Sequence, residues 1–298
     1  MAGGRAGRSP RPPSRPHGAA AARAACGPRP LFLLFLLLLL LLLLARLWRR
    51  GTAPLEPAGR AVLITGCDSG FGHLLALRLH RLGFTVFAGC LCPGGEGAKR
   101  LQREAGAGTG RLRVLRLDVT RARDVLAAKE LVLSHLPERG RIVFMSSIIA
   151  YFALGNGIYS MTKAAIEKFC DALRLEMKKF GVRVCIIQPG NYARSTKIQP
   201  PVSAEEIWNE LSEEEKAVYN KEYVQERANF FNSILSEGST NGNEVVDAMV
   251  DALTSPAPKA RYMVAKLKEK ALVFVCALFP TVVMDSVLSY ALSKVKLA

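Results

Sequence analysis

The sequence predicts an α/β protein whose core is a parallel sheet flanked by helices. Two stretches carry the prediction, RAVLITGCDSGFGHLLALRLHRLGFTVFAGCL at 60–91 and GRIVFMSSIIAYFALGNGIYSMTKAAIEKFCDALRLEM at 140–177. Each passes from a short apolar run through a turn into a helical pattern, which is the order of a crossover unit between parallel strands. The run VRVCIIQPGNY at 182–192 predicts another buried strand.

Composition and charge exclude several classes of protein. The 298 residues are half hydrophobic, which is enough for one large domain with appendages. The net charge is +16, but the first 60 residues contribute +9 of it, and no basic tract interleaved with aromatics occurs in the rest. We therefore expect no nucleic-acid partner. The seven cysteines are scattered, which predicts reduced core thiols, and no metal site is expected.

The N-terminal part predicts a membrane protein. An Arg-rich leader (1–30) precedes a predicted transmembrane anchor (31–48) that contains LFLLFLLLLLLLLLA, and a Pro- and Gly-containing linker (49–59) follows. A cleaved signal peptide is the alternative, but ARLWRR replaces a small-residue cleavage site after the run. We expect a chain anchored in the endoplasmic reticulum or mitochondrial membrane, since an acid-free, Arg-rich leader suits both.

The first unit contains a glycine pattern that favours nucleotide binding. Thr65-Gly66-x-x-x-Gly70-x-Gly72 lies where the predicted strand passes into a helix. Glycine there lets the backbone turn tightly and approach a pyrophosphate, whose charge the helix N-terminus stabilises. The predicted cofactor-binding residues of this turn are Thr65, Gly66, Ser69, Gly70, Phe71 and Gly72.

The second unit contains a candidate catalytic pair. Tyr159 and Lys163 are four residues apart on a predicted helix, so their side chains share one face. A cation there is expected to lower the phenol pKa, so that Tyr159 exchanges a proton with a substrate hydroxyl. Ser147, twelve residues before Tyr159, is predicted to hold the carbonyl oxygen, with Ser146 as the fallback.

These motifs together resemble the short-chain dehydrogenase/reductase family, a Rossmann-like doubly wound fold. The resemblance implies the catalytic residues Ser147, Tyr159 and Lys163, and it adds Asp118 and Val119 at the adenine and Pro189 and Gly190 beside the nicotinamide. It implies NAD as cofactor, with NADP less favoured, because the wording of GCDSGFG and VFAGCL is typical of NAD enzymes. The similar branch is membrane-associated and includes D-β-hydroxybutyrate dehydrogenase, 17β-hydroxysteroid dehydrogenase type 2 and the retinol dehydrogenases.

The predicted dehydrogenase domain (60–262) lacks its middle. The family places a helix, a strand and a helix between the strand that ends at Leu117 and the one that starts at Arg141, but this chain has one helical stretch, Ala122 to Leu136. Two crossover units of roughly 30 residues each are expected there and about one fits near 120–140, so the chain needs a family-type insert of about 50 residues between Arg139 and Gly140. The family's Asn-Asn-Ala-Gly strand and part of its dimer interface are missing with this segment. Its loss either leaves a slot between the flanking strands or lets them pair directly.

The C-terminal part predicts contact with a lipophilic substrate. Residues 197–235 are expected to form a lid, with Trp208, Tyr219, Tyr223 and Phe230 as candidate lining residues, and the apolar segment 263–298 a membrane-lying or substrate-funnel element. Expected partners are a small lipophilic alcohol or hydroxy acid, membrane lipid and a homo-oligomer weakened by the missing helix. Two functions remain open: an NAD(P)-dependent dehydrogenase that interconverts a secondary alcohol and a ketone, and a non-catalytic shortened chain.

Overall fold

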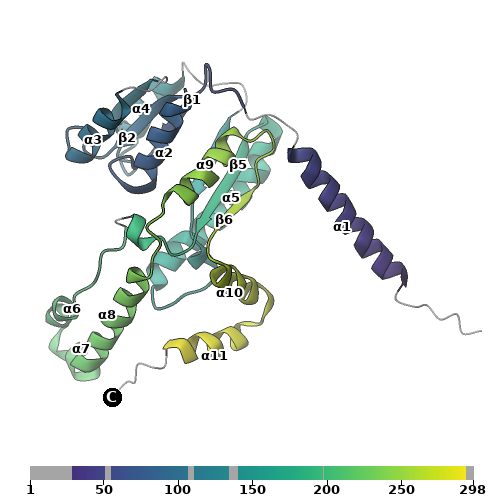
Figure 1. Ribbon diagram of the computed structural model, residues 1–298. Helices are drawn as coiled ribbons and strands as arrows, with labels where there is room; N and C mark the ends of the chain where they lie inside the picture. The colour runs from purple at the N-terminus through teal and green to yellow at the C-terminus, as the bar shows by residue number, and fades with distance from the viewer. Residues whose placement is uncertain (1–28, 51–54, 107–110, 134–139, 197, 293–298) are drawn as a thin grey trace, which may run out of the picture. The chain divides into compact units, whose positions relative to one another are not determined.

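The chain forms two compact units, Met1–Thr52 and Ala53–Ala298. Every strand belongs to the second unit (Figure 1). The computed structural model describes residues 29–50, 55–106, 111–133, 140–196 and 198–292.

The first unit contains a single described element, helix α1 (Arg29–Arg50). Several of its leucine side chains are exposed, for example Leu37 and Leu41. Among the residues that the structure describes, no helix is long and apolar enough to cross a membrane. The anchor expected over 31–48 therefore stays a prediction.

The N-terminal half of the second unit is a three-stranded parallel sheet in the order β1-β2-β3. It consists of β1 (Ala61–Ile64), β2 (Thr85–Cys90) and β3 (Leu112–Arg116). The crossover helices between them are α2 (Gly70–Arg81), which the strand-to-helix pattern predicts, and α3 (Glu96–Ala105). After β3 comes α4 (Ala122–Leu133), which confirms a helix in the shortened segment, while 134–139 lie outside the described residues.

The C-terminal half is a second three-stranded parallel sheet in the order β4-β5-β6. Its strands are β4 (Arg141–Met145), β5 (Arg183–Pro189) and β6 (Arg261–Val264). The long helix α5 (Gly157–Met177) connects β4 to β5 and packs on β5. The remaining helices between and after these strands are η1 (Ile148–Tyr151), η2 (Lys178–Phe180), η3 (Ala193–Ser195), α6 (Ala204–Glu210), α7 (Glu213–Val218), α8 (Lys221–Ser236), α9 (Asn243–Thr254), α10 (Leu267–Leu278) and α11 (Thr281–Leu292).

The apolar tail is divided in two, as Pro280 predicts. A proline cannot continue a helix, so α10 ends before it and α11 begins after it. Both helices leave large apolar side chains exposed, including Leu267 at 84% and Val282 at 76%.

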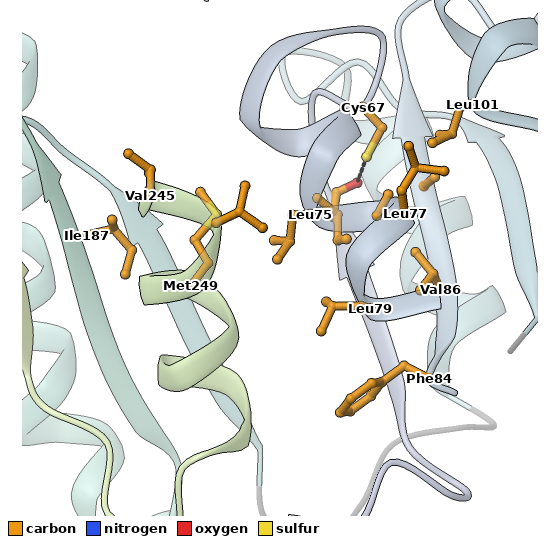
Figure 2. Packing of buried hydrophobic residues seen from close by; sticks show 14 of the residues in the cluster. Cys67, Leu75, Leu77, Leu79, Phe84, Val86, Leu101, Ile187, Val245 and Met249 are labelled. Atoms are coloured by element: carbon orange, nitrogen blue, oxygen red, sulfur yellow. Dashed lines mark hydrogen bonds between the residues drawn. The ribbon is translucent and has the colours of Figure 1, made fainter. Parts of the chain in front are cut away.

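The main hydrophobic core joins the two halves through helices rather than through strands. Leu75 and Leu79 of α2 are buried in the same cluster as Val245 and Met249 of α9 (Figure 2). Arg78 of α2 also donates a hydrogen bond of 3.2 Å to Asp247 of α9, but that pair is exposed and contributes little. Apolar burial between α2 and α9 is therefore the main described link between the two sheets.

The predicted single sheet is wrong, because the strands on either side of the missing segment do not pair. Among the described residues, β1 pairs with β2 and β4 pairs with β5, and neither has a partner on its other side. Burial agrees with this: β2 and β5 are almost wholly buried, whereas Leu63 of β1 is 37% exposed and all five residues of β4 are partly exposed. Strands that are central in a doubly wound sheet are edge strands here, so of the two expected outcomes direct pairing did not occur.

Candidate active site

A cavity of about 290 Å³ lies at the carboxyl ends of β4 and β5. It brings together all three predicted catalytic residues, Ser147, Tyr159 and Lys163, with Pro189 and Gly190. More than half of its other lining residues are apolar, and eight of these come from η1, the loop after it, α8 and α10: Ile148, Ile149, Phe152, Leu154, Phe231, Ile234, Leu235 and Leu272. Four charged residues line it as well: Glu237, Lys266, Lys268 and Glu269. Carboxyl ends of parallel strands are where α/β folds place their ligands.

Helix α5 presents Tyr159 and Lys163 to this cavity from its first two turns. The helix begins two residues before Tyr159, at Gly157, and the side chain of its N-cap residue Asn156 accepts a hydrogen bond of 3.3 Å from the Tyr159 N–H. This cap satisfies one backbone donor that the helix leaves open and fixes where the first turn starts. Asn156 also lines the cavity.

The protonation of the pair differs from the expected pattern. The pKa of Tyr159 is raised by burial, an effect that a hydrogen bond with Ser147 opposes. The pKa of Lys163 is lowered by burial. The expected lowering of the phenol pKa by a cation is therefore wrong for this geometry. The Lys163 ammonium lies 5.4 Å from the centre of the Tyr159 ring and donates to the Met145 carbonyl at 3.3 Å, so desolvation outweighs its charge.

The two serines have different surroundings. Ser147 Oγ donates to the Pro189 carbonyl at 3.2 Å and accepts from the Ile149 N–H at 3.3 Å. Ser146 is 2% exposed, and its Oγ donates to the Lys163 carbonyl at 3.3 Å. The hydroxyl of Ser147 is the one that reaches the Tyr159 phenol, which favours it over the fallback.

A buried polar network holds the catalytic helix against the sheet. Gln188 of β5 donates to Glu167 of α5 at 3.0 Å and to the Tyr151 hydroxyl of η1 at 2.8 Å. Arg261 of β6 completes the network by donating to Glu167 at 3.1 Å. Buried groups that are all paired in this way fix one arrangement, because any other leaves a polar group unsatisfied.

The glycine turn between β1 and α2 has the geometry of a phosphate cradle. Gly66 and Gly70 have φ values of 69° and 61°, a region that favours glycine. A Cβ on Gly72 would lie 2.4 Å from the Gly66 carbonyl oxygen, so the helix can start this close to the strand only without a side chain. Ser69 occupies the N-cap of α2 without a side-chain hydrogen bond, which leaves the first N–H groups of the helix free for an anion. Thr65 and Ser69 are exposed beside this turn.

Asp118, one of the two residues predicted to contact the adenine, already forms hydrogen bonds within the protein. The Asp118 carboxylate accepts from the Thr120 N–H at 3.0 Å and the Thr120 hydroxyl at 2.6 Å, and these bonds lower its pKa. It also pairs with Arg121 at 3.3 Å. Val119 is 63% exposed. The Asp118 carboxylate thus stabilises the turn that it begins, by hydrogen bonds to Thr120. Its two oxygens can still accept further hydrogen bonds, for example from an adenine.

The structure brings some of the predicted site residues together and leaves others apart. Of the glycine turn, Phe71 lines the cavity of Tyr159 and packs edge-on against Tyr192 with 6.2 Å between ring centres. Tyr159, Lys163, Pro189 and Gly190, which are also predicted to contact the cofactor, line it too. The other residues predicted for the glycine turn and the adenine do not line it: Thr65, Gly66, Ser69, Gly70, Gly72, Asp118 and Val119.

Two functional candidates escaped the sequence reasoning because they act over long separations. The Asp68 carboxylate accepts from the Leu91 N–H at 2.9 Å and the Cys92 N–H at 3.3 Å, so an acid does stand at the end of β2 although the strand itself supplies none. Glu269 of α10 accepts from the Asn191 N–H at 3.0 Å and lines the cavity. An acid in a glycine turn was the one available signal for Asp68.

The lid prediction is wrong in its residues. Trp208, Tyr219, Tyr223 and Phe230 do not line the cavity, whereas Phe231, Ile234 and Leu235 of α8 do. The helical phase explains this, since residues one turn apart on the inner face of α8 point to the cavity and Phe230 points away, beside Arg227. Thr196, beyond the Pro189-Gly190 loop, lines the cavity, whereas Arg194 is exposed.

The thiols confirm the predicted reduced state. All six described cysteines are free, and burial raises the pKa of Cys90 to about 11. Within the described residues no cluster of ligating side chains suits a metal ion.

Known proteins agree with these motifs. A family model described as short chain dehydrogenase matches residues 125–207. The mitochondrial D-beta-hydroxybutyrate dehydrogenase of Bos taurus is 32% identical and covers 72% of this chain and 79% of its own length. Retinol dehydrogenase 7 of Mus musculus is 30% identical, with 77% and 88% covered. The chain belongs to the short-chain dehydrogenase/reductase family.

Solved structures support the fold of this short-chain dehydrogenase/reductase. A short-chain dehydrogenase/reductase from Burkholderia phymatum, solved in complex with NAD, has a TM-score of 0.53 at 15% identity and covers 75% of this chain and 94% of its own. At this identity the likeness concerns the fold alone. It agrees with the Rossmann-like parallel arrangement of both sheets.

The lengths of the matches reveal the missing segment. The bovine match extends over 276 residues but covers 72% of this chain, about 215 residues, so about 60 residues of the match have no counterpart here. For the mouse enzyme 77% is about 229 of 283 residues, which leaves about 54. Both values are close to the insert of about 50 residues that the family pattern requires.

Proposed function

We propose that this short-chain oxidoreductase uses NAD to interconvert a lipophilic secondary alcohol and its ketone, with Tyr159 as proton donor and acceptor. The observation that carries the proposal is the shared cavity of Ser147, Tyr159 and Lys163 next to the Pro189-Gly190 loop. A substrate oxygen placed between Ser147 and Tyr159 would receive hydrogen bonds from two hydroxyls. Because the Tyr159 pKa is raised, the phenol is protonated at neutral pH and is ready to donate to a developing alkoxide.

Lys163 has a positioning role in this proposal. Its ammonium is held under the Tyr159 ring by the Met145 carbonyl at the end of β4. There it favours negative charge on the ring and therefore stabilises the phenolate that remains after proton donation. Ser147 adds a hydrogen bond to the same oxygen.

The described residues fit NAD. The positive φ values of Gly66 and Gly70, the uncapped start of α2 and the space that a side chain on Gly72 would fill suit a pyrophosphate. NAD would accept the hydride when the alcohol is oxidised, and NADH would supply it when the ketone is reduced. Asp68 at the end of β2 supports NAD over NADP, because a carboxylate there repels a 2′-phosphate and accepts from a ribose hydroxyl.

The lining of the cavity supports a lipophilic substrate. Its walls are mainly apolar, and its volume of about 290 Å³ would leave much space to water around a small hydroxy acid. Filling an apolar pocket with hydrocarbon is favourable, whereas leaving it to water is not. The retinol and steroid types of alcohol therefore fit better than 3-hydroxybutyrate. We also propose that the chain works at a membrane surface, which the exposed apolar side chains of α1, α10 and α11 support.

The test combines a substrate panel with two matched hydroxyl deletions. NAD reduction is measured with retinol, a 17β-hydroxysteroid and 3-hydroxybutyrate for the full chain, Tyr159→Phe and Tyr219→Phe. Tyr159→Phe should lower turnover by about 100-fold or more while the shift in melting temperature caused by NAD persists. Tyr219 is 41% exposed and lies outside the cavity, so Tyr219→Phe should change turnover by less than about threefold. Equal losses in both variants would refute the assignment.

A second candidate function is favoured by the missing segment. Unpaired edges on β1 and β4 and about 55 absent residues suit a shortened chain without catalysis that associates with relatives or with membrane. Absence of turnover on all three substrates, together with no response of the melting temperature to NAD, would favour this candidate.

A further inference from the structure

A second hollow lies at the opposite end of the β4-β5-β6 sheet from the candidate active site. Its volume is about 1180 Å³. Arg141 and Arg183, the first residues of β4 and β5, line it, whereas Ser147 and Pro189 of the active site follow or end the same strands. The end of α5, η2 and the loops at 55–60 and 256–260 complete its walls. The length of β5 separates the two sites.

The lining of this hollow is strongly basic. Of the described residues, no Asp or Glu lines it, while seven Lys and Arg side chains do: Arg60, Arg141, Arg174, Lys178, Lys179, Arg183 and Lys259. Arg174 is neutralised by Asp171 at 2.8 Å. Among the described residues the other six form no ion pair with a carboxylate.

These charges are not simply a solvated surface. Arg60 and Arg141 are only partly exposed, and each uses a guanidinium N–H on a backbone carbonyl, that of Glu56 at 2.9 Å and that of Ala252 at 2.9 Å. Burial and the neighbouring Arg183 and Arg60 lower the pKa of Arg141. Like charges held in a concave, partly dry site repel one another, and a multivalent anion bound between them removes that repulsion.

Apolar side chains stand at the rim of the same hollow. Leu175 is 72% exposed and Phe180 is 61% exposed, and both line it. Lys179 lies with its ammonium 5.1 Å from the centre of the Phe180 ring. Lysines beside exposed Leu and Phe are the composition of a surface that meets lipid headgroups, where cations bind phosphate and the apolar groups enter the interface.

We propose that this hollow binds the phosphate-bearing headgroup of an anionic phospholipid. Arg141, Arg183 and Lys179 hold the phosphate oxygens, since guanidinium groups match phosphate in two-point hydrogen bonds and an ammonium adds a point charge. Leu175 and Phe180 then lie against the lipid surface. The site is independent of the chemistry at Tyr159 and requires neither NAD nor substrate.

The experiment measures how the full chain floats with vesicles of phosphatidylcholine alone and of phosphatidylcholine containing a phosphatidylinositol bisphosphate. Comparison of the two vesicles cancels binding by apolar helices, which both lipids attract equally. The test variant is Lys179→Gln/Arg183→Gln. The control is Arg113→Gln/Lys168→Gln, which removes the same charge from two residues outside the hollow. All four residues are exposed. Each basic residue near an anionic surface contributes about fivefold, so the test variant should lose roughly 25-fold of the preference for anionic vesicles and the control little.

Three other outcomes would overturn the proposal. Equal losses in test and control variants would show that net charge, not the hollow, drives binding. No preference of the parent chain for the anionic vesicles would exclude the lipid. Titration with soluble inositol trisphosphate forms a separate arm: binding there that depends on Lys179 and Arg183, without vesicle preference, would assign the hollow to a free phosphate compound. Far-ultraviolet circular dichroism checks folding, and Lys178→Gln/Lys179→Gln replaces the test variant if it fails to fold.

Discussion

The two three-stranded sheets carry the same kind of unit but differ in how completely their sites are built. In the β4-β5-β6 half, Ser147, Tyr159 and Lys163 meet in one cavity, and Gln188, Glu167 and Arg261 hold the catalytic helix on the sheet. In the β1-β2-β3 half the glycine turn is formed, but its residues other than Phe71 lie outside that cavity.

The difference shows which features depend on local sequence and which depend on the missing strand. A glycine turn and a capped helix form from contacts within a few residues, so both survive the deletion. The distance between the nucleotide turn and the catalytic pair depends instead on a strand between β1 and β4. Helix α2 and helix α9 share one hydrophobic cluster, but β1 and β4 belong to separate sheets.

The largest expected effect comes from restoring the middle of the sheet. Insertion of a family-type segment of about 55 residues between Arg139 and Gly140 should raise dehydrogenase activity at least about 100-fold, because even a 1 Å displacement of reacting groups costs on the order of 100-fold. It should also raise the melting temperature, since β1 and β4 would gain partners. An insert of equal length rich in Gly and Ser is the control. Equal gains from both inserts, or full activity without either, would show that the two halves already meet correctly.

A single added methyl group in the glycine turn should weaken NAD binding without affecting the cavity of Tyr159. In Gly72→Ala the new Cβ would lie 2.4 Å from the Gly66 oxygen and 3.1 Å from the Thr65 oxygen. The turn must shift, at a cost of about 2 kcal/mol, which is about 30-fold in NAD affinity. Gly94→Ala is the control in the same half, because nothing lies within 4 Å of its added Cβ. Calorimetric titration with NAD measures both. Unchanged affinity in Gly72→Ala would mean that NAD does not use this turn.

Sequence reasoning succeeded where a motif and its contacts are close along the chain. Tyr159 and Lys163 follow from spacing on one helix, and Gly66, Gly70 and Gly72 from a strand-to-helix turn. The prediction of missing residues followed from length alone, and the matches with relatives agree with it.

What sequence reasoning missed depends on contacts between distant residues. Asp68 reaches Leu91 across 23 positions, and Glu269 reaches Asn191 across 78. The sequence also could not decide between a slot and direct pairing of the flanking strands, because both satisfy the local patterns. The Tyr159 pKa was misjudged since spacing gives the neighbour's identity but not the desolvation of the phenol.

The pH profile should separate the two directions of catalysis. Oxidation needs the Tyr159 phenolate, and the phenol pKa is raised above its usual value of about 10. The rate of alcohol oxidation should therefore rise about tenfold per pH unit between pH 7 and 9, whereas ketone reduction, which uses the protonated phenol, should stay nearly level. Initial rates in both directions measure this, with Tyr159→Phe as a background that should lack the slope. An oxidation rate that levels off near pH 7 would mean that binding of substrate and cofactor lowers the phenol pKa, as the sequence alone suggests.

The smallest expected effect concerns the choice of cofactor in the nucleotide half. Asp68→Asn keeps an oxygen that can accept from the Leu91 N–H but removes the charge at the end of β2. Loss of a repulsion near the surface of about 1 kcal/mol should reduce the preference for NAD over NADP by about fivefold, with stability little changed. The control is Glu96→Gln, which removes an exposed acid of the same half. Asp124→Asn would not serve, because the Asp124 carboxylate is buried and paired with Arg116. Calorimetric titration of the chain that carries the family-type insert, first with NAD and then with NADP, gives the ratio of the two affinities. A preference that Asp68→Asn leaves unchanged would mean that the acid serves only to fasten the glycine turn to β2, and the choice of cofactor would then rest on the rest of the adenosine site.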